Sequence, residues 1–177
     1  MERHLYQEYN KLVFCFLLFC NYISMPKTYK KRSNNSATRK NRKSNGSSLD
    51  AFQKQITVVF LEMLMMVKLF HWKTHSYATH KATDELYEKL NENIDNFIEV
   101  LLGKTGSRID LMSQKSISLI DLNSQEKLKS KIMSLKSYFV DLDNNKALST
   151  MSNSDLFNIR DEILGNLNQF MYLLTFK

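Results

Sequence analysis

The clearest pattern along the chain is the recurrence of apolar side chains every three or four residues, the period of an α-helix with one buried face. Four segments within residues 49–177 carry this period. One proline and four glycines in the whole chain also fit an all-α protein better than a β-rich one. The expected core positions are Phe52, Ile56, Val59, Phe60, Met63, Val67 and Phe70; Leu86, Leu90, Ile94, Phe97 and Leu101; Leu128, Ile132, Leu135, Phe139 and Leu142; and Leu156, Ile159, Ile163, Leu167, Phe170 and Leu174.

Capping residues and glycine set the expected ends of these helices. Ser47 and Ser48 are natural caps for the first helix, which should reach the His71-Trp72 pair. The second helix covers roughly residues 77–102 and should stop at Gly103, because glycine tolerates the left-handed conformation that closes many helices. The caps predicted for the third and fourth helices lie at residues 123–126 and 152–155.

The connections between the helices have unequal lengths. The first and last are short, whereas residues 104–123 form a poorly patterned segment of about twenty residues. Extended at ~3.3 Å per residue, this segment reaches up to ~66 Å, and the second helix is only ~38 Å long at ~1.5 Å per residue. The third helix can therefore run parallel to the second. This order of loops predicts a ferritin-like four-helix bundle with a long crossover.

Positive charge is concentrated before the bundle. Residues 25–48 contain eight basic residues and no acidic one, and the charges of residues 1–24 cancel. Because the whole chain carries a net charge of +7, residues 49–177 have a net charge of −1. Such a segment cannot bury enough apolar surface to fold, and we expect a disordered tail. Flexible cations bind DNA by releasing counterions, although a solvated tail or a localisation signal fits the same composition. The candidate nucleic-acid-binding residues are Lys27, Lys30, Lys31, Arg32, Arg39, Lys40, Arg42 and Lys43.

Residues 1–24 contain an apolar run, residues 12–23, that is too short for a membrane-spanning helix of ~20 residues. It is similar to the apolar region of a signal peptide, but no small-x-small cleavage site follows. Three interpretations stay open: an extension before a true start at Met25, a signal or membrane anchor, and core packing. Both cysteines, Cys15 and Cys20, lie in this run, so the bundle has none for a disulfide or a zinc site. We expect a reducing compartment such as the cytoplasm and no membrane partner; a secretory or membrane route depends on this run alone.

Candidate metal ligands occur in and just before the second helix: His71, His80, Asp84, Asp95 and Glu99. His80 and Asp84 are four residues apart, as are Asp95 and Glu99, so each pair faces one way on a helix. Asp84 and Asp95 are separated by about 1100° of helical turn and about 16 Å along the axis, so the pairs share a stripe but cannot bind one metal within one chain. An antiparallel neighbour, related by a two-fold axis near residues 89–90, would bring unlike pairs together. The spacing therefore predicts two identical composite sites in a symmetric dimer.

Together with the crossover, these motifs give residues 49–177 a resemblance to the Dps miniferritins, the DNA-protection branch of the ferritin-like superfamily. The family pattern is His-Trp, then His-x3-Asp, then Asp-x3-Glu eleven residues after the first Asp, and this sequence has all three parts at that spacing. A weaker resemblance links the stretch to ferritin-like proteins of large DNA viruses, which would place the protein in a host cell or a virion. Two features depart from the pattern: the segment after His-Trp is short and contains an additional His75, and Gly103 arrives early.

The resemblance implies that the five ligands meet across a two-fold interface, bind iron, and oxidise Fe(II) with peroxide or oxygen inside a dodecameric shell. Imidazole and carboxylate ligands suit Fe(II). A basic N-terminal tail is also what lets some family members bind DNA. An alternative hypothesis retains the fold without the metal site and makes the protein a nucleic-acid-binding or packaging scaffold, with the acidic stripe as a solvated helix face. A third hypothesis is a membrane-tethered helical module that uses residues 12–23.

Overall fold

A computed structural model describes residues 43–176, so residues 1–24 and the tail cations from Lys27 to Arg42 lie outside the described part. The described residues contain no strand, which confirms the prediction of an all-α fold. Its elements belong to one compact unit of the chain, residues 39–177. They are α2 (Lys43–Lys73), α3 (Tyr77–Thr105), α4 (Gln125–Val140), α5 (Ser154–Leu173) and the short 3₁₀ segments η1 (Asp141–Asn144) and η2 (Leu148–Thr150).

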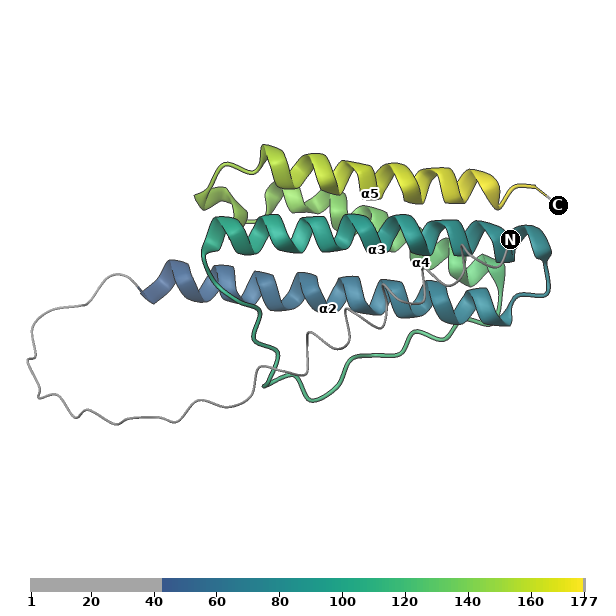
Figure 1. Ribbon diagram of the computed structural model, residues 1–177, viewed down its shortest axis with the longest axis horizontal. Helices are drawn as coiled ribbons and strands as arrows, with labels where there is room; N and C mark the ends of the chain where they lie inside the picture. Colours follow the sequence, from purple (N-terminus) through teal and green to yellow (C-terminus); the bar gives the residue numbers. More distant parts are fainter. Residues whose placement is uncertain (1–42, 177) are drawn as a thin grey trace, which may run out of the picture. The chain divides into compact units, whose positions relative to one another are not determined.

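The four helices lie alongside one another, with α2 and α5 running in one direction and α3 and α4 in the other (Figure 1). Two contacts fix these directions. Lys104 near the end of α3 pairs with Asp155 at the start of α5 at 2.7 Å, and Gln125 at the start of α4 donates to the carbonyl of Leu174 just after α5 at 2.9 Å. The parallel course of the second and third predicted helices is confirmed.

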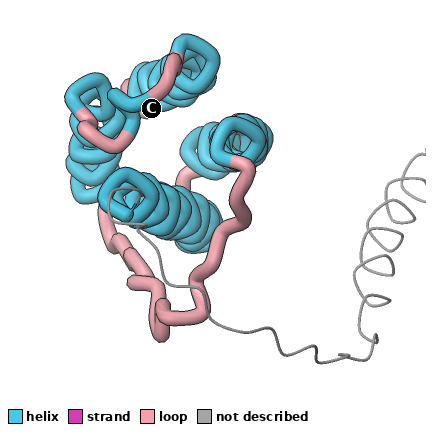
Figure 2. The backbone as a smooth tube through the Cα atoms, turned by 90° about the vertical axis from the view of Figure 1, so that its left-hand side faces the viewer, coloured by secondary structure: helices cyan, strands magenta, loops and turns pink. Residues whose placement is uncertain are grey.

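The core lies between the four helices, which surround it in the end-on view (Figure 2). Every predicted core position is buried except Val59 and Ile159, which are partly buried. Phe60 of α2 is central: its ring lies 5.3 Å from that of Phe97 in α3, edge to face, and 5.7 Å from that of Phe139 in α4, stacked. One side chain thus joins three helices, because aromatic rings combine large buried area with preferred mutual geometry.

The first helix begins earlier than predicted. It is already helical at Lys43, so Ser47 and Ser48 are not its caps, and the last residues assigned to the disordered tail are helical instead. The stretch Ser48–Lys73 is long and apolar enough, by length and composition alone, to span a membrane. A core helix passes the same test, and the residues of this helix at the core period are buried in the core of the bundle, except the partly buried Val59.

The end of the second helix also differs from the prediction. Gly103 lies inside α3, and the helix ends at Gly106, which has the left-handed φ of 64° and donates its N–H to the carbonyl of Leu102. From the sequence alone, either Gly103 or Gly106 could end the helix. Thr105 decides between them, because its hydroxyl accepts a hydrogen bond at 2.7 Å from the buried Gln53 of α2 and so holds the last turn in place. The early glycine noted as a departure is therefore not a helix end.

A long connection, residues 107–124, confirms the predicted crossover. At its start Gln53 donates to the hydroxyl of Ser107 at 2.9 Å, and near its end Asp121 pairs with Lys73 of α2 at 2.6 Å. Between these points the backbone N–H of Ser118 donates to the Glu62 carboxylate. The crossover is thus attached to α2 along its course, with its two ends at opposite ends of the bundle (Figure 1).

The caps of the last two helices lie one residue after the predicted starts. Ser124 caps α4 by accepting from the N–H of Lys127 at 3.3 Å. Asn153 precedes α5 but makes no capping bond, and its amide donates to the carbonyl of Leu148 instead. The buried Arg160 of α5 pairs with Asp143 of η1 and with Asp161, which attaches the α4–α5 connection to the bundle.

Candidate metal centre

The turn between α2 and α3 brings the two histidines of the candidate site together. Only residues 74–76 separate the helices. Ser76 begins α3 by accepting from the N–H of Thr79 at 3.3 Å, and the N–H of Thr74 donates back to the carbonyl of Phe70 at 3.0 Å. His71, in the last turn of α2, therefore lies beside His80, in the first turn of α3.

The two imidazole rings form a reciprocal pair. Their centroids are 3.9 Å apart and their planes are inclined by 24°. Nδ1 of His71 lies 3.0 Å from the carbonyl oxygen of His80, and Nδ1 of His80 lies 3.1 Å from the carbonyl oxygen of His71. Because a carbonyl only accepts, each Nδ1 must carry the proton and donate it. In its neutral form, each ring then has its lone pair on Nε2, the atom that would bind a metal.

Thr83 supports this pair from one turn further along α3, and sequence reasoning did not identify it. The side chain is fully buried. Its hydroxyl lies 2.8 Å from the carbonyl of Thr79 and 2.9 Å from that of His80, so it donates within its own helix. The same oxygen is 3.3 Å from Nδ1 of His71 and can accept a second bond from that N–H. A threonine whose hydroxyl bonds to a carbonyl of the preceding turn is common in helices. Only the contact with His71 therefore connects Thr83 to the candidate site, and the sequence does not reveal that contact.

Asp84 completes the group on α3. Its Oδ1 lies 3.8 Å from Nε2 of His71 and 3.7 Å from Nζ of Lys68 in α2. The histidine side chain is 9% exposed and the aspartate side chain 40% exposed, so the carboxylate lies at the edge of the bundle. Lys68 is a second residue that sequence reasoning did not identify, and its ammonium also lies 4.7 Å from the centroid of the Tyr87 ring.

Asp95 and Glu99 lie apart from this group. Both are exposed on α3, and no hydrogen bond or ion pair among residues 48–176 involves their side chains. At ~1.5 Å per residue, Asp95 is about 16 Å further along the helix than Asp84. In the described part of this single chain, no three histidine, cysteine, aspartate or glutamate side chains converge on one metal position. His75 is exposed in the turn and His71 is buried, so the short loop does not displace His71 from His80.

An apolar groove of about 430 Å³ is lined by residues of α2, α3 and the crossover, among them Lys68, the ion-pair partner of Asp84. Lys68 and Asn91 are its polar lining, and Trp72, Leu119 and Leu61 are 67%, 64% and 36% exposed. The remaining lining residues are Leu64, Met65, Leu69 and Tyr87. Exposed apolar surface of this kind is typical of a contact with another molecule.

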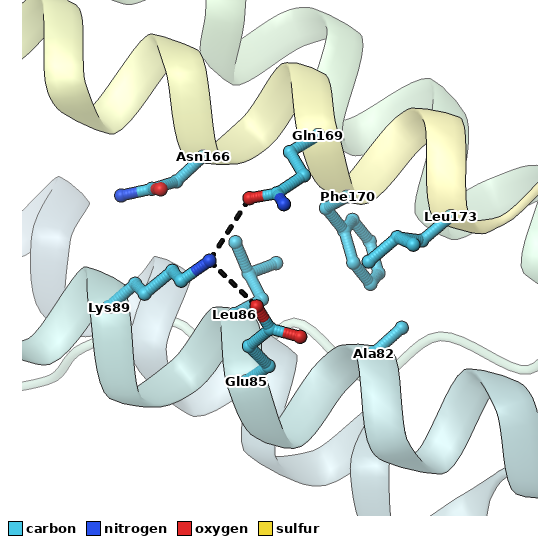
Figure 3. A pocket seen from close by; sticks show the side chains of 8 residues that line it. All are labelled: Ala82, Glu85, Leu86, Lys89, Asn166, Gln169, Phe170 and Leu173. Atoms are coloured by element: carbon cyan, nitrogen blue, oxygen red, sulfur yellow. Dashed lines mark hydrogen bonds and ion pairs between the residues drawn. The ribbon is translucent and has the colours of Figure 1, made fainter.

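The opposite side of α3 has a different character. There Lys89 donates to Glu85 at 2.7 Å and to Gln169 of α5 at 3.0 Å, over a hollow between α3 and α5 (Figure 3). The hollow holds about 10 Å³, which is about the space of one water molecule. It has no room for a larger ligand.

Of the predicted nucleic-acid-binding residues, only Lys43 falls in the described part, where it is the first residue of α2. One family model matches the chain: residues 71–174 match the model described as a family of unknown function, DUF5856. The matched range begins at His71 and includes all five candidate ligands. No curated protein and no solved structure matches the chain.

Proposed function

The chain belongs to the family DUF5856, and we propose that it is a Dps-like iron protein that oxidises Fe(II) at sites shared between two subunits. The reciprocal pairing of His71 and His80 carries the proposal, because it fixes both rings and leaves both Nε2 atoms available as ligands. Histidines that bind metals usually donate their other N–H to a carbonyl or carboxylate in this way. With the Asp84 carboxylate 3.8 Å from one Nε2, the donor set is the nitrogen and oxygen mixture that suits Fe(II).

The second half of the site comes from another copy of the chain in this proposal. Asp95 and Glu99 are exposed carboxylates on the stripe that includes Asp84, and no hydrogen bond or ion pair among residues 48–176 involves their side chains. A two-fold axis near residues 89–90 exchanges positions 84 and 95 of two antiparallel α3 helices. His71, His80 and Asp84 of each subunit then face Asp95 and Glu99 of the partner subunit.

The apolar groove between α2 and α3 supports this mode of association. Its lining includes Lys68, the ion-pair partner of Asp84, and its most exposed members are Trp72 and Leu119. A two-fold symmetric interface uses the same surface patch on both subunits, so the association would bury the apolar groove of each subunit. The helix order with its long crossover supports a ferritin-like bundle, and in the proposed assembly such bundles form a shell around stored iron.

The chain's own residues have distinct roles in this chemistry. Iron is the substrate, and each Fe(II) gives one electron to peroxide or oxygen. The two imidazoles and Asp84 bind Fe(II), and the carboxylates of Asp95 and Glu99 compensate the additional positive charge as Fe(III) forms. Thr83 is a positioning residue, because it contacts the ring N–H of His71 and not the ligand atom.

The test is Fe(II) oxidation by the full chain, followed by the absorbance of the ferric product above a protein-free blank. We expect His80→Ala and Glu99→Ala each to reduce the rate at least about tenfold, the effect of about 1.4 kcal/mol of lost transition-state stabilisation. Glu92→Ala is the matched control, because Glu92 is exposed on α3 and is outside both ligand groups. Equal rates for the wild type and both ligand variants contradict the proposal.

A mixing experiment tests the sharing of sites. When the His80→Ala and Glu99→Ala chains are co-expressed, half of the randomly formed dimers contain both chains, and one of the two sites in each has all its ligands. Co-expression should therefore recover about a quarter of the wild-type activity, although each variant alone should keep only about a tenth of it or less. No recovery from verified mixed dimers would show that each site is built within one chain.

A second candidate function rests on the composition of residues 25–48, which contain eight basic residues and no acidic one. In this alternative the bundle is a scaffold without metal chemistry, and the tail binds DNA. Deleting residues 1–42 should abolish DNA retardation in a gel and leave the oligomer mass unchanged, because α2 begins at Lys43. Retardation should also weaken steeply with salt. Unchanged DNA binding by the truncated chain contradicts this function.

A further inference from the structure

Lys68 occupies a position that sequence patterns do not mark, next to the one carboxylate that belongs to the histidine half of the candidate site. Its Nζ lies 3.7 Å from Oδ1 of Asp84, and Nε2 of His71 lies 3.8 Å from the same oxygen. The lysine side chain is 32% exposed and reaches the site from α2, the helix that also carries His71. A positive charge therefore already neutralises the carboxylate that an incoming divalent cation would need.

A lysine and a divalent metal cannot both use Asp84 favourably. A metal ion bound to a carboxylate lies ~2.0–2.2 Å from its oxygen. An ammonium within 4 Å of that oxygen would then be a near neighbour of the metal, and like charges repel at such distances. Lys68 must withdraw before or while the metal binds, and the loss of its ion pair with Asp84 opposes binding.

Tyr87 is a second partner within reach of Lys68. The ammonium already lies 4.7 Å from the centroid of this ring, within the range of a cation–π contact. Tyr87 comes one turn after Asp84 on α3, and the flexible four-carbon stem of a lysine allows the head group to move between neighbouring partners. The adjacent groove, lined by Lys68, Tyr87 and Asn91, gives the side chain space to move.

We infer that Lys68 is an internal counter-cation of the site: it neutralises Asp84 when no metal is bound, and a divalent cation must displace it toward Tyr87. This inference rests on the proposed function and extends it, because it identifies Lys68 as a residue that lowers the affinity of the site for divalent cations. A monovalent cation gains too little to displace the lysine, so Lys68 also favours divalent over monovalent cations.

The experiment is calorimetric titration of the full chain with Co²⁺ alone, without an oxidant. We expect Lys68→Met to bind Co²⁺ about tenfold more tightly than the wild type, because one partly exposed like charge has been removed. Lys68→Gln, which keeps a polar head group, should show the same direction. The matched control is Lys89→Met, which removes a charge from the other side of α3, where Lys89 contacts Glu85 and Gln169 and not Asp84.

Two further arms separate the possible failures. The gain in Lys68→Met should shrink as salt is raised, since ions screen partly exposed charges, and Tyr87→Leu should weaken Co²⁺ binding while Tyr87→Phe does not. If the wild type binds Co²⁺, Asp84→Asn weakens it, and Lys68→Met leaves it unchanged or weaker, the counter-cation is wrong and the metal site stands. If neither the wild type nor Lys68→Met binds Co²⁺, both proposals are overturned.

Discussion

Two glycines three residues apart should respond to the same substitution with opposite signs. Gly103 lies inside α3, whereas Gly106 ends the helix with a left-handed φ of 64°. A Cβ added at either position meets nothing within 4 Å, so only the backbone conformation contributes to the difference. Gly103→Ala should raise the free energy of unfolding by ~0.8–1 kcal/mol through helix propensity. Gly106→Ala should lower it by ~1–2 kcal/mol, because an L side chain disfavours the left-handed region.

The assay is urea denaturation of the full chain followed by circular dichroism, with thermal midpoints as a second reading. The two variants should differ by ~2–3 kcal/mol in the free energy of unfolding, and their midpoints should move in opposite directions by about 2–5 °C each. Gly165→Ala serves as the control, since Gly165 is a helical residue of α5 with the same open surroundings and should behave like Gly103→Ala. A destabilised Gly103→Ala combined with an unaffected Gly106→Ala would mean that α3 ends three residues earlier, and the reasoning would be refuted.

Three further outcomes test the packing between helices. Phe60→Ala should lower the free energy of unfolding by ~3–5 kcal/mol in a urea titration, because its ring fills the centre of the core and joins three helices; a cost below ~1 kcal/mol would contradict that packing. Gln53→Met should cost ~1–3 kcal/mol and increase proteolysis of the crossover, since the partly buried hydroxyls of Thr105 and Ser107 each lose a partner in α2. The hydrogen bond from Lys104 lowers the pKa of Asp155, so this pair stabilises the fold above about pH 4, the ordinary range of the carboxyl, and the contribution is lost as the pH falls through the lowered pKa. The wild type should therefore lose slightly more stability than Asp155→Asn between about pH 5 and pH 3 in denaturation curves, and parallel pH profiles would contradict the pairing.

The helices and their buried faces could be predicted from the sequence, because the buried positions of a helix recur with a period that the order of apolar residues shows directly. Leu128, Ile132, Leu135 and Phe139 are buried as their spacing predicts. The crossover also followed from length alone, since a poorly patterned connection of that size can reach across a bundle. These properties depend on local pattern and chain geometry, and tertiary contacts only confirm them.

Other features could not be predicted because tertiary contacts decide them. Gly103 and Gly106 are equally capable of ending a helix, and the hydrogen bond from Gln53 to Thr105 across the bundle favours the later one. Within the candidate site, the spacing singled out the candidate ligands. The contact between Lys68 and Asp84 depends on how two helices are rotated against each other, and no periodicity encodes that rotation.

The reciprocal bonds of His71 and His80 affect what the retention of these histidines in other family members would mean. The imidazole of His80 bonds to a carbonyl in the last turn of α2, and that of His71 bonds to one in the first turn of α3, so the pair fastens the two helices whether or not iron is present. Selection for folding alone would keep both histidines in a descendant that had lost the chemistry. Asp95 and Glu99 make no such contact among residues 48–176. Their retention or loss among members of DUF5856 would therefore test selection for the proposed chemistry, whereas retention of the histidines fits selection for either the chemistry or the hairpin.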